Sequence, residues 1–578
     1  MNRSLWIAAG TVLLSGAAVF AVHVVEQAAK PAVELPAMLP EGALLSIEAR
    51  DFGSLLHDWN TSDEKRVWLS SDNHAAFSNS RLFTRLSQAQ DEFSAAASLP
   101  TDASLLEKVA GKESCLAVYD IGNLEFVYVT RLGQQDIEST PLWQIRDKFE
   151  QRKEAGTVFY MHKDPQSSRT AAFAAKDGWL ILATREDLVA GVLDRLAGSS
   201  SHSLSSEAWY AEAVKQAGSE RGDLRMALNL EKIVPSPYFR SYWVQRNITE
   251  MKQYASAVSD LYRTSESYRE QRVLMRRAAA SSPPQSDVRQ LAALAPSDAA
   301  FYEAQASPST ESVLSSLREN LLEVRPQQSR SEDKIAPAQA SAENAGSAAQ
   351  LDVFIDQAPV VEHAADPYQS LRALLDAQQP DAILQVYSTR APSAGVFVSL
   401  QSATILSSPK DWDESAVRAS LTAAMQPGLT AGGLGAGWEK RSNSSGDYLA
   451  FNGAVSLYAK INGRQLLLTN DAALLEELMA RRQAPNPTGT EGNVTYAARF
   501  RPRQEQTNFR LLTAQLDLVG RRGSADSGRA FGDGQSPAFF SGNMASLGRV
   551  FSRLDSEQIE EKDQGARVVQ TVTYQWAH

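Results

Sequence analysis

A strand–turn–strand–helix pattern occurs twice in this chain of 578 residues, and this repetition constrains the fold more than any other feature of the sequence. In the first copy Asp177 and Gly178 separate two apolar runs, and in the second copy Asn462 and Gly463 do so. Both pairs suit a two-residue hairpin turn in which the two central residues have positive φ. Gly178 aligns with Gly463 without a gap, so we predict one module that is present twice.

A threonine follows each hairpin at the same distance from its glycine, and a helical pattern comes directly after it. These residues are Thr184 and Thr469. Because a threonine hydroxyl can accept a hydrogen bond from the first turn of a helix, we predict that each caps the helix that follows. Asp187 completes an arrangement with Thr184 that resembles a capping box.

Further strand-like segments occur in the same order in both halves. The stretch Pro-Glu-Gly-Ala at 40–43 is echoed by Pro-Ser-Asp-Ala at 296–299, and each precedes a strand and then a helix. A second apparent hairpin follows in each half, formed by 115–119 with 126–130 and by 383–387 with 396–400. These runs are rich in β-branched and aromatic residues with turn formers between them, which is typical of strands.

The sequence therefore predicts the α+β class, with two duplicated modules at 36–235 and 290–520. Each is expected to be an antiparallel sheet with helices on one face. The second module contains an insert at 325–349 that is rich in Ser, Ala, Gln and Glu and is expected to be disordered. Residues 521–578 should form a flexible loop, then a helix near 544–554 and a strand at 568–576 that completes the sheet of the second module.

A connector at 236–289 separates the two modules and is predicted to be one long helix over 238–277. Apolar residues recur there at alternating spacings of four and three, which is a near-heptad pattern. The resulting seam consists of Val244, Ile248, Met251, Ala255, Val258 and Tyr262. Such a seam suits self-association or a partner helix, and packing of the helix on its own domain is the alternative.

The N-terminal segment 1–30 is predicted to be a transmembrane anchor. Arg3 precedes about 21 largely apolar residues, enough for a helix that crosses a bilayer. The positive charge on the short side places the N-terminus in the cytoplasm and the bulk of the chain outside it. A cleaved signal peptide is the alternative, with a possible cut after Ala21. We expect a single-pass protein of the inner (cytoplasmic) membrane whose main part is extracytoplasmic.

The composition limits the partners and the compartment chemistry. The formal net charge is -11, and an acidic chain gains nothing from releasing the counterions of a phosphate backbone, so nucleic acid is an unlikely partner. The single cysteine, Cys115, opens an apolar run and cannot form an intramolecular disulfide. We predict that it is a small buried strand residue.

Catalytic and metal motifs give weak signals. None of the seven histidines belongs to a zinc-type pair, so no metal or cofactor is predicted. Ser62 and Lys65 match the SxxK pattern of penicillin-binding proteins, but the companion Lys-Thr-Gly motif is missing from the sequence. The glycine-rich stretch 433–437 follows a helix, whereas a dinucleotide loop must follow a strand, so we interpret it as a flexible turn.

Several segments resemble those of an uncharacterised bacterial family whose members carry domain-of-unknown-function labels. The segments are 39–59, 80–83 (Ser-Arg-Leu-Phe), 119–124 (Tyr-Asp-Ile-Gly-Asn-Leu), 238–243 (Tyr-Phe-Arg-Ser-Tyr-Trp) and Trp576. Members of that family are exported and anchored at the N-terminus, and the resemblance covers most of the chain. It implies the same placement here and implies no substrate, cofactor or catalytic residue.

Together these patterns favour a non-enzymatic binding or scaffold module that faces the periplasm and has a protein partner in the envelope. Two alternatives stay open. One is a carrier or sensor of an apolar ligand, held between a sheet and its covering helices. The other is a cell-wall-directed hydrolase with an unrecognised site. The sequence leaves the oligomeric state open.

Overall fold

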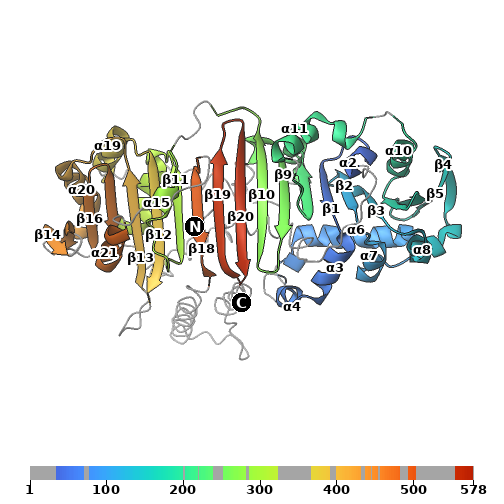
Figure 1. Cartoon of the computed structure of the whole chain (residues 1–578), viewed down its shortest axis with the longest axis horizontal. Coiled ribbons are helices and arrows are strands. Elements are labelled where there is room, and N and C mark those ends of the chain that lie inside the picture. Colours follow the sequence, from blue (N-terminus) through green and yellow to red (C-terminus); the bar gives the residue numbers. More distant parts are fainter. Residues whose placement is uncertain are drawn as a thin grey trace, which may run out of the picture. The chain divides into compact units, whose positions relative to one another are not determined.

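The computed structural model describes residues 34–70, 74, 77–199, 202–218, 220–238, 251–280, 286–322, 366–390, 399–430, 437–443, 446–452, 456–481, 493–502 and 554–576. They belong to two compact units. Unit 1 comprises Met1–Pro284 with Arg499–His578, and unit 2 comprises Gln285–Ala498. Figure 1 labels their helices and strands. The predicted α+β class is confirmed, since both units combine helices with antiparallel sheet.

Unit 1 contains one antiparallel sheet and helices that pack on it. Its strands are β1 (Leu45–Ala49), β2 (Ser114–Asp120), β3 (Glu125–Arg131), β4 (Glu150–Glu154), β5 (Thr157–Lys163), β6 (Thr170–Lys176), β7 (Trp179–Ala183), β8 (Leu224–Leu228), β9 (Tyr254–Arg263), β10 (Ser267–Arg276), β19 (Leu554–Asp563) and β20 (Arg567–Trp576). Its helices are α2 (Leu35–Met38), α3 (Phe52–Thr61), α4 (Asp63–Leu69), α6 (Arg81–Ala97), α7 (Ala103–Val109), α8 (Gln134–Ser139), α9 (Pro141–Gln144), η1 (Arg146–Lys148), α10 (Glu186–Leu196), η2 (Leu204–Ser206), α11 (Ala208–Ala217) and α12 (Leu230–Ile233). The strand order is β4-β5-β6-β7-β3-β2-β1-β8-β9-β10-β20-β19.

Unit 2 has the same kind of architecture. Its strands are β11 (Phe301–Ala306), β12 (Ala382–Arg390), β13 (Ser399–Ser407), β14 (Gly437–Asn443), β15 (Gly446–Asn452), β16 (Leu457–Asn462), β17 (Gln465–Thr469) and β18 (Tyr496–Phe500), of which the last begins in this unit. Its helices are α15 (Arg289–Ala292), α16 (Thr310–Leu317), the π-helical turn η3 (Arg318–Leu322), α19 (Gln369–Gln378), α20 (Glu414–Thr430) and α21 (Ala472–Arg481). The strand order is β14-β15-β16-β17-β13-β12-β11, and β18 pairs with β11. With β18 added, the order in unit 2 is β14-β15-β16-β17-β13-β12-β11-β18. Unit 1 contains the same order, β4-β5-β6-β7-β3-β2-β1-β8, in which each label is ten lower.

Helices cover both faces of each sheet, so the predicted coverage of one face is wrong. In β7, Ile181 packs with α10, whereas Leu180 and Leu182 point to the opposite face and pack with α6, α7 and α8. In β17, Leu467 packs with α21, whereas Leu466 and Leu468 pack with α16, α19 and α20. Strands covered on both faces are apolar at successive positions, which explains the unbroken apolar runs of both hairpins.

The two hairpins on which the predicted repeat rests differ by one residue from the gapless alignment. Asp177 (φ 52) and Gly178 (φ 79) form the predicted two-residue turn with positive φ at both positions. In the second hairpin Asn462 is the last residue of β16 and pairs with Gln465. The turn there consists of Gly463 (φ 56) and Arg464, so the prediction of positive φ at Asn462 is wrong. Glycine adopts a positive φ without steric cost, which explains why Gly463 and not Asn462 occupies the first position of this turn.

The two threonines do not cap helices as predicted, because they bind the neighbouring strand instead. Thr184 Oγ1 accepts from Phe126 N (2.9 Å) and donates to Phe126 O (3.3 Å). Thr469 Oγ1 donates to Ser402 O (2.8 Å), and the cap of α21 is Asp471, whose carboxylate accepts from Leu474 N (2.8 Å). Both hydroxyls are buried, so they satisfy backbone groups inside the sheet.

The predicted long helix over 238–277 is wrong from residue 254 onward, where the chain forms the hairpin β9–β10. Of the predicted seam, Ala255, Val258 and Tyr262 lie in β9, Met251 lies just before it, and Val244 and Ile248 lie outside the described residues. Val258 packs with α11 and its neighbour Ala257 with α12, on the other face. Burial on both faces removed the alternation that identifies a strand, and the remaining apolar spacing was compatible with a helix.

The strand predicted at 568–576 is present as β20, but it pairs with β10 in unit 1 and not, as predicted, within the second module. Among the described helices none is long and apolar enough to cross a membrane. The predicted anchor at 1–30, the insert at 325–349 and the loop at 521–536 lie outside the described residues, as does the predicted helix near 544–554 apart from Leu554, the first residue of β19.

Candidate functional site

Residues that the sequence patterns single out have structural roles. Ser62 is the N-cap of α4: its hydroxyl accepts from Lys65 N (3.1 Å) and donates to Trp59 O (3.0 Å). The Lys65 amine donates to Asn60 Oδ1 (2.5 Å). A nucleophilic serine needs its hydroxyl beside a base, and here the hydroxyl is used by the backbone.

Cys115 is a buried strand residue, as predicted, and it is 1% exposed in β2. Burial raises the pKa of its thiol well above the usual range, and the nearby Glu48 carboxylate acts in the same direction. A reactive cysteine requires a lowered pKa and some exposure. Cys115 therefore contributes packing.

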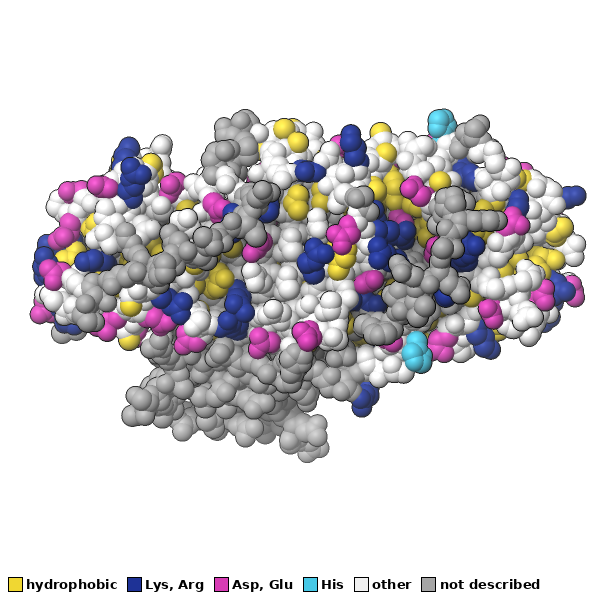
Figure 2. Space-filling model, in the orientation of Figure 1, with side chains coloured by type: hydrophobic (Ala, Val, Ile, Leu, Met, Phe, Trp, Pro, Cys, Tyr) yellow, Lys and Arg dark blue, Asp and Glu magenta, His cyan; other side chains and the backbone are white. Residues whose placement is uncertain are grey.

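Charges of both signs are interspersed over the described surface shown in Figure 2. The buried charges are more distinctive than the surface ones. In the described residues they form three clusters, all within unit 1, and each joins strands or helices that are distant in sequence.

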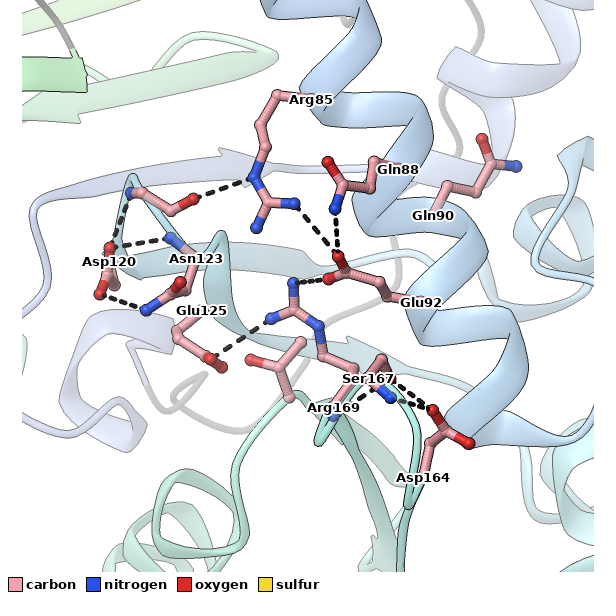
Figure 3. Close-up of polar contacts among 12 residues, drawn as sticks. Arg85, Gln88, Gln90, Glu92, Asp120, Asn123, Glu125, Asp164, Ser167 and Arg169 are labelled. Carbon is pink, nitrogen blue, oxygen red and sulfur yellow. Dashed lines mark hydrogen bonds and ion pairs between the residues drawn. The ribbon is translucent and has the colours of Figure 1, made fainter.

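The first cluster centres on Arg169, which precedes β6 and has a side chain that is 5% exposed (Figure 3). Its guanidinium reaches Glu92 Oε2 of α6 (2.8 Å) and Glu125 Oε1 of β3 (3.3 Å). Arg85 binds the second oxygen of Glu92 (3.3 Å) and the carbonyl of Gly122 (3.0 Å). Two arginines and two glutamates thus neutralise one another.

The turn between β2 and β3 completes this first cluster. Asp120 Oδ1 accepts from Gly122 N (2.7 Å) and Asn123 N (3.1 Å), so the side chain closes the turn that holds the Arg85 contact. Burial alone would raise the pKa of Glu92, but hydrogen bonds and charges from Arg169 and Arg85 outweigh it and lower the pKa. A carboxylate with a lowered pKa is a poor base, so the cluster fastens α6 to the sheet.

The second cluster is a row of side chains across β1, β8 and β9. Glu48 lies opposite Arg225, which lies opposite Asp260. Arg225 donates two hydrogen bonds of 2.8 Å to Asp260, and Tyr210 of α11 donates to Glu48 Oε1 (2.6 Å). Arg221 Nη2 lies 3.1 Å from the other oxygen of Glu48. Each charge in this row has an opposite charge beside it, which is the condition for burying charges in a sheet.

The third cluster lies on β10, β20 and β19, and one of its carboxyls has no cation of its own. Arg272 forms two hydrogen bonds with Glu270 of its own strand (2.6 and 2.5 Å) and one with Gln570 (3.0 Å). Ser259 donates to the same Glu270 carboxylate (2.6 Å). Glu557 is 8% exposed, and its Oε1 has no hydrogen-bond partner among the described residues.

The chemistry of Glu557 follows from this arrangement. Burial raises its pKa to about 7; Arg272 opposes the shift, and Glu270 adds to it. Arg272 already neutralises Glu270, so ionisation of Glu557 leaves a buried negative charge in excess. Carboxyls of this kind exchange protons near neutral pH and are candidates for functional sites. We therefore regard Glu557 with Glu270 and Arg272 as the candidate functional site.

Sequence reasoning did not find this site, because its members are far apart in the chain and Glu557 stands in a run of charged residues. A charged run is usually exposed, and nothing in its spacing indicates that one member is buried. Of the six predicted seam residues, the four that the structure describes lie in or just before β9 and are not members of this site, and Val244 and Ile248 lie outside the described residues. In the described part of the chain, no group of three or more His, Cys, Asp or Glu residues is placed to hold a metal ion.

Comparison with known proteins gives little guidance. No family model matches the chain, and no curated protein matches it. Among solved structures, crystal form I of TP0453 aligns over 43% of this chain and 80% of its own, with 9% identity and a TM-score of 0.24. Crystal form III of TP0453 aligns over 43% and 81%, with 9% identity and a TM-score of 0.23. A likeness of this size leaves the function to be argued from the chain's own residues.

Proposed function

We propose that this protein is a non-enzymatic binding or scaffold protein of the bacterial cell envelope, built from one α+β module that is present twice. The N-terminal segment anchors it in the inner membrane, the bulk of the chain faces the periplasm, and its partner is a protein. The resemblance to exported, anchored proteins of unknown function supports this placement. The observation that carries the proposal is the identical strand order of β1–β8 and β11–β18.

Matching details support the duplication. Phe126 N donates to Thr184 Oγ1 at the end of β7, and Ser402 N donates to Asn470 Oδ1 at the end of β17, both at 2.9 Å. The backbone contacts beside them match as well: Thr184 N donates to Phe126 O (3.1 Å) and Asn470 N to Ser402 O (3.2 Å). Thr184 therefore corresponds to Asn470, one residue beyond its counterpart in the gapless alignment. A strand order and a closing contact that occur in both units support a duplication.

The state of the buried charges supports a role without catalysis. Glu92, Glu125 and Asp260 accept from arginines, and Glu48 is held by Tyr210 and Arg221. Glu557 exchanges a proton, but its described neighbours Glu270 and Arg272 are bound to each other. A general acid or base needs a free proton-transfer group within hydrogen-bond reach of a substrate, and the paired carboxylates are instead bound to their own partners.

Placement in the envelope is tested with reporter fusions to the C-terminus of the full chain. Alkaline phosphatase is active only after export, so we expect an active fusion, recovered with membranes after an alkaline carbonate wash. The same chain fused to a fluorescent protein that matures only in the cytoplasm should stay dark. Removal of residues 2–30 should abolish phosphatase activity. Sequencing the N-terminus of the mature protein distinguishes the anchor from a cleaved signal peptide. A bright cytoplasmic fusion contradicts the placement.

The binding role is tested by native mass spectrometry of the protein purified without detergent exchange. We expect the mass of the bare chain or of a complex with another protein. A retained small apolar molecule would support the carrier alternative instead. Turnover of a cell-wall fragment that is lost in the Glu557→Gln variant, with its folding unchanged, would support the hydrolase alternative.

A further inference from the structure

The hairpins β9–β10 and β19–β20 follow the same plan. Every residue of the second hairpin carries a number 300 higher than its counterpart, from 254 and 554 at the start to 276 and 576 at the end. Both have the same register and the same one-residue bulge, at Ala255 in the first and Asp555 in the second. Only one of the 20 strand positions has the same residue in both, Ser256 and Ser556. The correspondence therefore lies in the geometry.

The pairing between β10 and β20 has the form of a two-fold interface. Gln271 lies opposite Thr571, and these two residues are counterparts. Pairing is reciprocal on either side of this position. Residue 270 lies opposite residue 572, which is the counterpart of residue 272, and residue 272 lies opposite residue 570, which is the counterpart of residue 270. Reciprocity of this kind defines the isologous interface of a symmetric dimer, in which both partners use the same surface. Figure 1 shows β9, β10, β20 and β19 side by side.

The sequence of β10 is complementary to itself in this register. If a second copy of β10 replaced β20, Glu270 would lie opposite Arg272 of the copy, and Arg272 opposite Glu270. Opposite charges directly across an antiparallel pair stabilise it. In the present chain, Arg272 binds Glu270 of its own strand and donates a hydrogen bond to Gln570 of the paired strand β20.

β10 differs from the free edge strand β4 in the burial of its charged side chains, although it also carries charges at Arg269, Glu270, Arg272 and Arg276. β4, which has one partner in the order of unit 1, is charged at four of its five positions, and Glu150 and Arg152 have side chains that are 59% and 49% exposed. Charged edge strands resist pairing with other chains. With β20 paired to it, the middle of β10 is buried, and Glu270 and Val273 are 3% and 0% exposed. β10 therefore has the character of an interior strand.

We propose that the edge of β10 is a self-recognition surface, and that the partner it fits is a second copy of its own hairpin. Unit 1 then contains the equivalent of a two-fold hairpin interface within one polypeptide, with β19–β20 in the place of a second copy's hairpin. This inference rests on the duplication proposed above. It assigns an interaction surface that neither the sequence patterns nor the comparisons indicate.

Position-specific crosslinking of the full chain tests the proposal. In a Cys115→Ala background, Val572→Pro removes a backbone donor from the middle of β20 and frees the edge of β10. Single cysteines are introduced by Arg269→Cys, Gln271→Cys or Val273→Cys, which lie on one face of β10. Two-fold pairing brings the thiols at 271 together, whereas those at 269 lie about 13 Å apart from each other. With a short bismaleimide, we expect most chains that carry Gln271→Cys to form crosslinked dimers. Chains that carry Arg269→Cys or Val273→Cys should give only the background yield of dimer.

Mixing provides the matched control, because a 269 chain and a 273 chain should crosslink with each other in the same register. Equal yields at the three positions, or no dimer at any, overturn the proposal. If the Val572→Pro chain does not fold by circular dichroism, the Gln271→Cys chain with Val572 intact is refolded with an excess of a synthetic peptide of residues 252–278. That peptide carries the thiol at 269, 271 or 273, and the same preference for 271 is expected. The export test above is independent, so failure here leaves the placement in the envelope intact.

Discussion

Units 1 and 2 share a strand order but differ in what they bury. In the described residues, the fully buried polar side chains of unit 2 are serines, threonines and one glutamine. Unit 1 buries six charged ones: Glu48, Arg169, Arg225, Asp260, Glu270 and Glu557. When Pro40 is aligned with Pro296, Glu48 corresponds to Ala304, which is 0% exposed. The strand order that the two units share is therefore compatible with a core that has no buried charge, and we expect the buried charges of unit 1 to contribute specificity more than stability.

The largest effect is expected from separating a buried pair that unit 2 does without. Arg225→Met leaves Asp260 buried without its cation, and we expect a loss of about 3–5 kcal/mol in the free energy of unfolding. The double variant Arg225→Met/Asp260→Leu should recover most of this loss, because replacing both members of a buried pair with apolar residues leaves no uncompensated charge. Urea unfolding followed by circular dichroism measures both. Equal losses in the single and double variants would show that the charges themselves stabilise unit 1.

The next effect concerns pH and Glu557, whose pKa is raised to about 7 from an ordinary 4.5. Between these values the folded chain holds a proton that the unfolded chain has released, so stability falls as pH rises from about 4.5 to about 7 and is level above. The full difference is roughly 3 kcal/mol, at 1.36 kcal/mol per pKa unit. Glu557→Gln should remove this dependence, so the variant is more stable than the parent at pH 8 and equal at pH 4.5. A stability difference that stays constant over that range contradicts the assignment.

Arg169 offers a comparison within unit 1 between a buried and an exposed arginine. Arg169→Met removes the shared cation of Glu92 and Glu125 and should cost about 2 kcal/mol at pH 7. The pKa of Glu92 is lower in the folded chain than in the unfolded chain. The ionised Glu92 therefore contributes its full stabilisation of the fold when the pH is above the ordinary pKa of a glutamate, and this contribution is lost as the pH falls through the lowered pKa. The cost of Arg169→Met should therefore shrink on acidification. Arg185→Met, at an exposed pair with Asp187, is the control and should change stability by less than about 0.5 kcal/mol.

The smallest effect tests whether the two units use equivalent contacts. Thr184→Val and Asn470→Leu each remove a side-chain hydrogen bond to the backbone of the neighbouring strand, and each should cost about 1 kcal/mol. Thermal unfolding of the two variants measures both losses. The double variant should show the sum, because the contacts lie in different units. A loss confined to Thr184→Val would mean that the resemblance between these contacts is only geometric.

Part of this fold could be predicted from sequence. The turn at Asp177 and Gly178, the α+β class and the burial of Cys115 follow from local chemistry, and the structure confirms them. The prediction failed at β9, where Ser256 and Asp260 are buried on a strand covered on both faces, so polarity no longer marks the exposed side.

The candidate site was beyond sequence reasoning for a different reason. The contact between Arg272 and Gln570 joins residues 298 positions apart, and that between Arg169 and Glu92 joins residues 77 apart. A single sequence carries no signal for pairs at such distances. The hairpin correspondence was equally hidden, since Ser256 and Ser556 are its one shared residue.

The position of β20 has a consequence for biosynthesis. The sheet of unit 1 needs residues 567–576 to pair with β10, and the whole of unit 2 is synthesised between the two strands. During vectorial synthesis, unit 1 must therefore wait with an open edge until residues 567–576 emerge, roughly 15–60 s at 5–20 residues per second. Pairing over so long a span is intrinsically slow. A chain interrupted by premature termination keeps that edge open, which gives chaperones and proteases a direct means of distinguishing incomplete chains from finished ones.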